Sequence, residues 1–167
     1  MSEPRSFSAR KGQFLNRWHA ARATRAKPRA TGFVSSPEPR TIGSFAKGRQ
    51  LLAGNFLFAG HLVQGDGTSI WALRAPNAAF TQELNGFAWL DDLAAVGDTA
   101  ARETAQLWLW DWIERYGRGR GAGWSPDLTG RRLMRWINHA IFLLRGRDSR
   151  DGAGQCCRLE SWRRGFG

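Results

Sequence analysis

The sequence predicts a mainly α-helical domain, preceded by a short β-hairpin and a basic N-terminal arm. Two long segments carry apolar residues at helical spacing, and an earlier segment carries an apolar run of strand length. The chain has 167 residues, of which 42% are hydrophobic, with 9 Trp and 10 Phe. This length and composition are typical of one globular domain with a substantial core.

The first 30 residues are predicted to form the basic arm, either as a surface helix or as a disordered segment. Phe14, Leu15 and Trp18 give one helical turn an apolar face, while arginines occupy the rest of that turn. Prolines and glycines then mark an irregular connector that continues through Thr41.

A β-hairpin is expected next. Residues 55–63 form an apolar run of strand length, and residues 70–73 are expected to form the second strand. Asp66 and Gly67 form a dipeptide that favours tight turns, so the turn is placed between the two runs.

Three helices are predicted after the hairpin, over residues 85–96, 98–116 and 126–144. Asp98 is expected to cap the second helix, because its carboxylate can accept from an unpaired amide of the first turn. Most of the circumference of that helix is apolar, which predicts packing on several sides. Its main apolar arc comprises Ala101, Ala105, Trp108, Leu109, Trp112 and Ile113.

The third helix has two contrasting faces. The face predicted to be buried comprises Leu133, Met134, Trp136, Ile137, Ala140, Ile141, Leu143 and Leu144. Guanidinium groups on the opposite face suit carboxylate or sulfate ligands. The predicted ligand-binding residues are Arg131, Arg132, Arg135, Asn138 and His139, with Trp124 as a stacking platform from the preceding loop. The alternatives are a solvated helix face, or Arg132 paired with carboxylates of the preceding helices.

The charge is strongly basic and unevenly placed. The net charge is +11; residues 1–50 carry 11 Lys/Arg, residues 51–114 carry two Arg against eight carboxylates, and residues 115–167 carry 12 Arg. This distribution favours a polyanionic partner or a solvated basic arm. The sequence pI of about 11.4 and the Arg-rich ends also fit a small basic nucleic-acid-binding protein.

Neither a cofactor nor a metal site is predicted. Cys156 and Cys157 are adjacent, and no zinc-ligand spacing occurs. No apolar run approaches the roughly 20 residues that span a membrane, and no signal peptide is recognised, so a cytoplasmic location is expected, with the cell envelope left open. Residues 149–167 have no periodicity and are predicted to be an unstructured tail or an out-of-frame product.

Two stretches resemble heparinase II/III-type polysaccharide lyases. Residues 87–94 resemble an aromatic-rich helix of that family's α/α toroid, and residues 124–136 resemble its Trp- and Arg-containing stretch. The matching positions in the second stretch are Trp124, Pro126, Arg132 and Trp136, whereas Gly130 and Arg135 depart from the family pattern.

The resemblance implies an incomplete α/α toroid over residues 31–148 and β-elimination on acidic, uronate-containing polysaccharide. The family's catalytic residues lie later in the fold, so it also implies an N-terminal part that is inactive alone, and no residue is assigned as catalytic. Asp91 and Asp92 point about 100° apart on a helix and cannot form a facing carboxylate pair. They are expected to be a surface charge and an ion-pair partner for an arginine.

Overall fold

A computed structural model of the chain describes residues 41–65, 69–119 and 121–144, together with five positions of the N-terminal arm. Those five are Phe14, Leu15, Trp18, Ala21 and Arg22, all helical and exposed. The rest of the predicted arm, the predicted turn dipeptide Asp66 and Gly67, and the tail over residues 149–167 lie outside the described residues.

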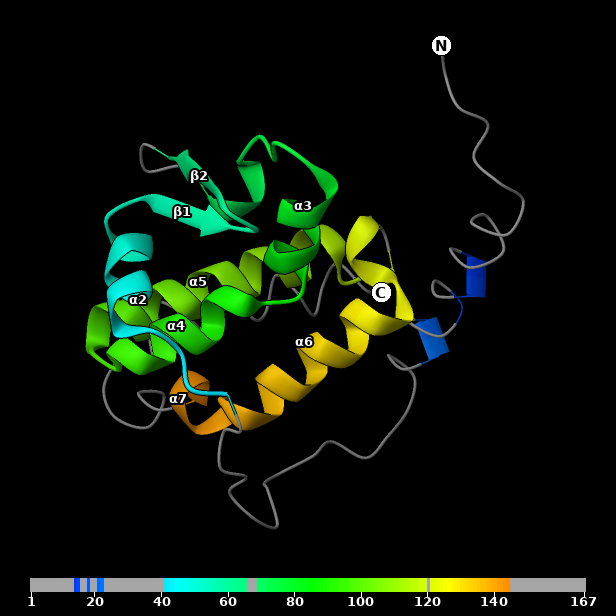
Figure 1. Cartoon of the computed structure of the whole chain (residues 1–167). Helices are drawn as coiled ribbons and strands as arrows, with labels where there is room; N and C mark the ends of the chain where they lie inside the picture. The colour runs from blue at the N-terminus through cyan, green and yellow to red at the C-terminus, as the bar shows by residue number, and fades with distance from the viewer. Residues whose placement is uncertain are drawn as a thin grey trace.

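The described part is mainly α-helical with one two-stranded antiparallel hairpin, as predicted. The elements run in the order α2 (Phe45–Leu52), β1 (Asn55–Phe58), β2 (His61–Gln64), η1 (Ile70–Ala72), α3 (Ala78–Asn85), α4 (Ala88–Val96), α5 (Thr99–Tyr116), η2 (Ala122–Trp124), α6 (Pro126–Asn138) and α7 (Ala140–Leu144). The hairpin lies on one side of α4 and α5, and α6 lies on the other (Figure 1). An α/α toroid is not shown by these elements.

The hairpin forms within the run that was predicted to be a single strand. Phe58 pairs with His61, so the turn is made by Ala59 and Gly60, whose φ angles are 50° and 78°. Two successive residues with positive φ match the right-handed twist of a hairpin, and glycine adopts this conformation without a steric penalty. The predicted second strand over residues 70–73 is wrong, because residues Ile70–Ala72 form the 3-10 helix η1, capped by the Ser69 hydroxyl.

Helices α3 and α4 replace the single helix predicted over residues 85–96. Asn77 caps α3 by accepting from the Phe80 amide, which places the helix start well before the predicted one. The chain then breaks at Phe87, a non-glycine residue with a φ of 63°. The Phe87 ring is fully buried against Trp71, Trp89, Trp112 and Trp136, and this packing holds the left-handed backbone in place.

The prediction for α5 is confirmed. Asp98 accepts from the Ala101 amide at 2.7 Å, and the helix ends at Tyr116. The residues buried from the predicted arc are Ala101, Ala105, Trp108 and Trp112. Tryptophan therefore serves mainly as core in this helix, where rings from several elements meet at tilted or edge-to-face angles.

Helix α2 was not predicted, and two glycines allow it to lie against α4. A Cβ on Gly48 would come within 2.3 Å of the Asp92 carbonyl oxygen, and one on Gly43 within 1.9 Å of the Asp91 carbonyl oxygen. The Ser44 amide donates to the Asp92 side chain at 2.8 Å. Close backbone approach and this hydrogen bond fix the start of α2 on α4.

Candidate functional site

Helix α6 faces the core with the side that the sequence indicated would face solvent. Its inward residues are Leu128, Arg132, Arg135, Trp136 and His139, with Arg135 and Trp136 partly buried. Of the face predicted to be buried, Leu133 and Met134 are more than half exposed. Trp136, Ala140 and Leu143 of that predicted face do pack inward, so the predicted orientation is wrong in part. Arg132 and Arg135 turn inward because the aliphatic stems of arginines pack like apolar side chains when their charged ends find acceptors.

Arg132 is the most buried cation of the described residues, at 2% exposure. Its Nη1 donates to the Gly123 carbonyl at 2.8 Å and to the Asn85 carbonyl at 3.4 Å. Its guanidinium carbon lies 4.1 Å from the centre of the Trp112 ring. Trp124 and Trp136 lie at 5.1 and 5.7 Å from the same carbon. Burial lowers the pKa of Arg132 to about 10, and the rings and carbonyls offset part of that desolvation.

Asp91 forms a second buried cluster with Arg135 and His139. One carboxylate oxygen accepts from Arg135 Nε at 2.7 Å, and the other lies 2.8 Å from His139 Nε2. Arg135 Nη1 also donates to the Gly86 carbonyl at 2.6 Å. Burial by itself would raise the pKa of Asp91, but the hydrogen bonds and charges of His139 and Arg135 lower it below the ordinary value.

The expectation for the two adjacent aspartates is confirmed in part. Asp91 is the expected ion-pair partner of an arginine, which is Arg135, and the pair lies mostly inside the fold. Asp92 is half-buried beside α2. Burial raises the pKa of Asp92 despite the hydrogen bond from the Ser44 amide.

The structure does not gather the six predicted binding residues on one open face. Arg132, Arg135 and His139 use their polar groups inside the fold, as described above. Trp124 is half-buried, and its Nε1 donates to the Tyr116 carbonyl at 2.7 Å. Arg131 is exposed and pairs with Asp127 on its own helix, and Asn138 is half-buried. A ligand-binding role for these residues stays a prediction.

Apolar side chains are exposed along the outer side of α6 and α7. They comprise Leu133, Met134, Ile141 and Leu144, each between 47% and 55% exposed. On α6, Ile137 lies between them and is half-buried. Contiguous exposed apolar side chains of this kind often mark a contact surface.

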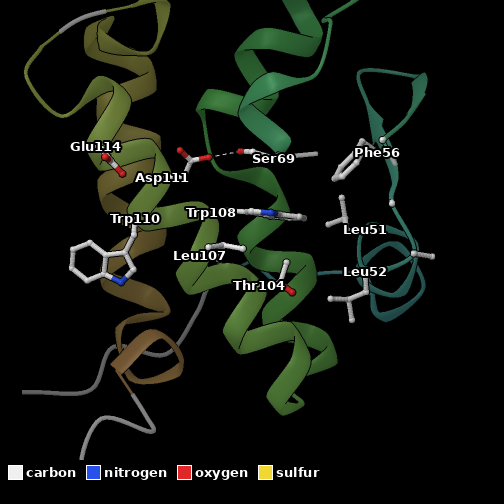
Figure 2. A pocket seen from close by; sticks show the side chains of 13 residues that line it. Leu51, Leu52, Phe56, Ser69, Thr104, Leu107, Trp108, Trp110, Asp111 and Glu114 are labelled. Atoms are coloured by element: carbon white, nitrogen blue, oxygen red, sulfur yellow. Dashed lines mark hydrogen bonds between the residues drawn. The ribbon is translucent and has the colours of Figure 1, made fainter. Parts of the chain in front are cut away.

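A groove of about 660 Å³ lies between α2 with β1 and helix α5. In Figure 2 the Trp108 side chain points toward Leu51 and Phe56, which lie across from α5. The lining comprises Leu51, Leu52, Ala53, Gly54, Phe56, Gly65, Ser69, Thr104, Leu107, Trp108, Trp110, Asp111 and Glu114. We call this the α2–α5 groove. Sequence patterns could not reveal it, because α2 was not predicted.

Ser69, Asp111 and Glu114 lie at one end of the groove, and Thr104 lies at the other (Figure 2). The Ser69 hydroxyl donates to the Asp111 carboxylate (Figure 2), which also accepts from Arg115. That hydrogen bond raises the pKa of Arg115. Among the described residues, no group of His, Cys, Asp and Glu side chains is arranged to hold a metal ion.

In the described part of the chain, none of the helices combines the length and hydrophobicity that crossing a membrane requires.

The chain is similar to one curated protein, FtsZ-localized protein C of Caulobacter vibrioides. The two are 33% identical over 110 residues, which cover 65% of this chain and 19% of the relative. The chain thus spans about a fifth of the length of the curated relative that it matches. No protein-family model matches the sequence, and no solved structure matches it.

These comparisons overturn the resemblance to heparinase II/III-type lyases. The lyase function, the acidic polysaccharide substrate and the family assignment are wrong, because the similarity found is to FtsZ-localized protein C and not to a lyase. The motif match depended on Trp124, Arg132 and Trp136, and these residues form the ring-and-guanidinium cluster of the core. Tryptophans and arginines at such spacing can serve packing alone, so they were a weak indicator of the chemistry.

Proposed function

We propose that this chain acts in bacterial cell division, as part of a protein that localises with FtsZ. The observation that carries the proposal is the 33% identity over 110 residues to FtsZ-localized protein C. Nothing in the described residues conflicts with a binding role: the polar clusters stabilise the fold, and apolar side chains on α6 and α7 are exposed for contact.

The proposal concerns localisation and binding, not catalysis. Arg132 and the Asp91 cluster are buried and use their hydrogen-bonding groups within the fold. Such clusters hold a scaffold in one conformation. A scaffold of this kind fits a module that presents surfaces to a protein partner.

The test in cells is the position of a fluorescent fusion of the full chain in Caulobacter vibrioides. We expect a band at the division site that disappears when FtsZ is depleted. A fusion that stays diffuse, or a band that persists without FtsZ, would contradict the proposal.

The test in solution is sedimentation of the purified chain with polymerised FtsZ. Because the net charge is +11, nonspecific attraction to any acidic polymer must be separated from specific binding. Lysozyme serves as a basic control protein, and the assay is repeated at about 0.15 M ionic strength, where exposed charges are screened beyond roughly 8 Å. We expect this chain to sediment with FtsZ under conditions in which lysozyme does not.

A further inference from the structure

The α2–α5 groove combines an apolar floor with acidic groups. The floor is provided by Leu51, Phe56 and Trp108, and Leu107 at its side is 59% exposed. Figure 2 shows Asp111 and Glu114 on the same helix as Trp108 and Leu107. None of the described residues that line the groove is a Lys or an Arg. A ligand that complements this surface is therefore apolar on one side and cationic on another.

The exposed side of α5 continues this pattern, and Glu103 adds one carboxylate outside the groove lining. Glu103, Leu107, Trp110 and Glu114 follow one another at spacings of three or four residues, which places them on one face of the helix. All four are exposed, and neither Glu103 nor Glu114 forms an ion pair with a described Lys or Arg. Two apolar side chains are thus flanked by two carboxylates along one helix.

The groove offers few polar groups that could bind a small polar ligand. Binding sites for such molecules usually contain several polar groups that converge on the ligand. Here the Ser69 hydroxyl and the Asp111 carboxylate already bind each other. An amphipathic helix fits better, because it inserts apolar side chains into a groove and keeps its charges at the edges.

The N-terminal arm of this chain has that chemistry. Residues 1–30 contain eight Lys/Arg and a single Glu. Phe14, Leu15 and Trp18 are helical, and their exposures are 70%, 53% and 48%. The guanidinium of Arg22 lies 5.1 Å from the centre of the Trp18 ring, so cations and rings share one helix surface.

We propose that this arm helix binds the α2–α5 groove of its own chain. Phe14, Leu15 and Trp18 contact the apolar lining, and the arginines of the arm lie near Glu103 and Glu114. The positive charge of the arm and the negative charge of this side of α5 attract each other. Because both belong to one chain, the effective concentration of the arm at the groove is high.

The connection between the arm and the groove is long enough for this contact. Residues 23–43 link Arg22 to the start of α2, and 21 extended residues can span about 70 Å. Helix α2 has eight residues, or about 12 Å, and its last turn already lines the groove. The linker is therefore long enough for the arm to move from its exposed position into the groove while α2–α7 stay in place.

The consequence is a masked surface. While the arm occupies the groove, Leu107 and the cations of the arm are both withheld from other partners. A ligand of either surface then competes with this internal contact.

The test uses the full chain with the photoreactive residue p-benzoylphenylalanine in place of Trp18. After illumination, mass spectrometry of the monomer band identifies the attachment sites. We expect them on α2 and α5 within the same chain. The charge of α5 is then reversed with Glu103→Lys and Glu114→Lys, which we expect to lower the crosslinking yield roughly tenfold.

A matched control is Asp127→Lys, which reverses an exposed carboxylate on α6 and should leave the yield unchanged. Circular dichroism checks that each variant is folded. Attachment to α6 or α7, attachment to a second copy in a dimer band, or no attachment overturns the proposal. An unchanged yield in the Glu103→Lys, Glu114→Lys variant also overturns it.

Discussion

Arg132 stabilises the fold through contacts that another cation cannot reproduce. It bridges the carbonyls of Gly123 and Asn85 and stacks on the Trp112 ring. A lysine carries the same charge, but its ammonium lacks the planar surface and the paired donors of guanidinium. The position therefore requires the shape of arginine as well as its charge.

We expect Arg132→Lys to lower the free energy of unfolding by about 2–4 kcal/mol, because buried carbonyls lose their donors and the ring contact is lost. Urea unfolding followed by circular dichroism measures this. The control is Arg131→Lys on the exposed side of the same helix, where we expect a change below about 1 kcal/mol. Equal effects of the two substitutions would contradict this role of Arg132.

Asp91 makes the stability of the fold depend on pH, with a loss of stability in acid. Its folded pKa lies below the ordinary carboxyl value of 3.8. The stabilisation from its charged form is thus complete above the unfolded pKa and is lost as the pH falls through the folded pKa. His139 and Arg135, which hold the carboxylate, are the cause.

We expect Asp91→Asn to lower the free energy of unfolding by about 3 kcal/mol at neutral pH, since Arg135 loses its buried counter-ion. The difference from the wild type should shrink as the pH falls below about 4. Urea unfolding at a series of pH values checks this, with Asp127→Asn as an exposed control. A difference that stays constant with pH would rule out the ionised carboxylate as its origin.

At the scale of elements, glycines decide how helices approach one another. Gly48 lies inside α2, and an added Cβ would meet the Asp92 carbonyl at 2.3 Å. Gly130 lies inside α6, and an added Cβ would have no heavy atom within 4 Å. Both glycines lie inside helices, and they differ in how closely another part of the chain approaches them in space.

We therefore expect opposite effects from the same substitution. Gly48→Ala should destabilise the fold by about 2 kcal/mol, because α2 must move away from α4. Gly130→Ala should stabilise it by about 0.5–1 kcal/mol through helix propensity. Thermal unfolding of both variants measures the changes, and a stabilising Gly48→Ala would show that α2 does not pack as described.

Element boundaries were predicted well where a local signal was strong. Asp98 and the tryptophans of α5 predicted that helix, because capping and apolar periodicity act over a few residues. The break at Phe87 and the turn at Ala59 were missed. Both need positive φ at a non-glycine residue, which surrounding packing imposes and local sequence does not indicate.

For the whole molecule, the outer side of α6 and α7 is exposed and not core. The exposed and the buried apolar residues of these helices form two separate sets. Matched substitutions in the two sets can therefore distinguish surface residues from core residues. We expect Leu133→Gln with Ile141→Gln to change the free energy of unfolding by less than about 0.5 kcal/mol per site.

Leu128→Gln and Leu143→Gln should each cost several times more, because these side chains are less than 10% exposed. If the outer substitutions unfold the protein as readily as the inner ones, α6 is turned the other way.

The sequence by itself determined the mainly α class, the strand-forming run that begins at Asn55, the extent of α5 and the strong basic charge, since these follow from composition and from local periodicity. Only the tertiary structure decided which side of α6 is buried. Three polar side chains of this helix face inward because they find hydrogen-bond acceptors there. Arg132 donates to the carbonyls of Asn85 and Gly123. Arg135 donates to the Gly86 carbonyl, and His139 lies against the Asp91 carboxylate. Those acceptors come from other parts of the chain, so a pattern of polar and apolar residues within one helix could not reveal them.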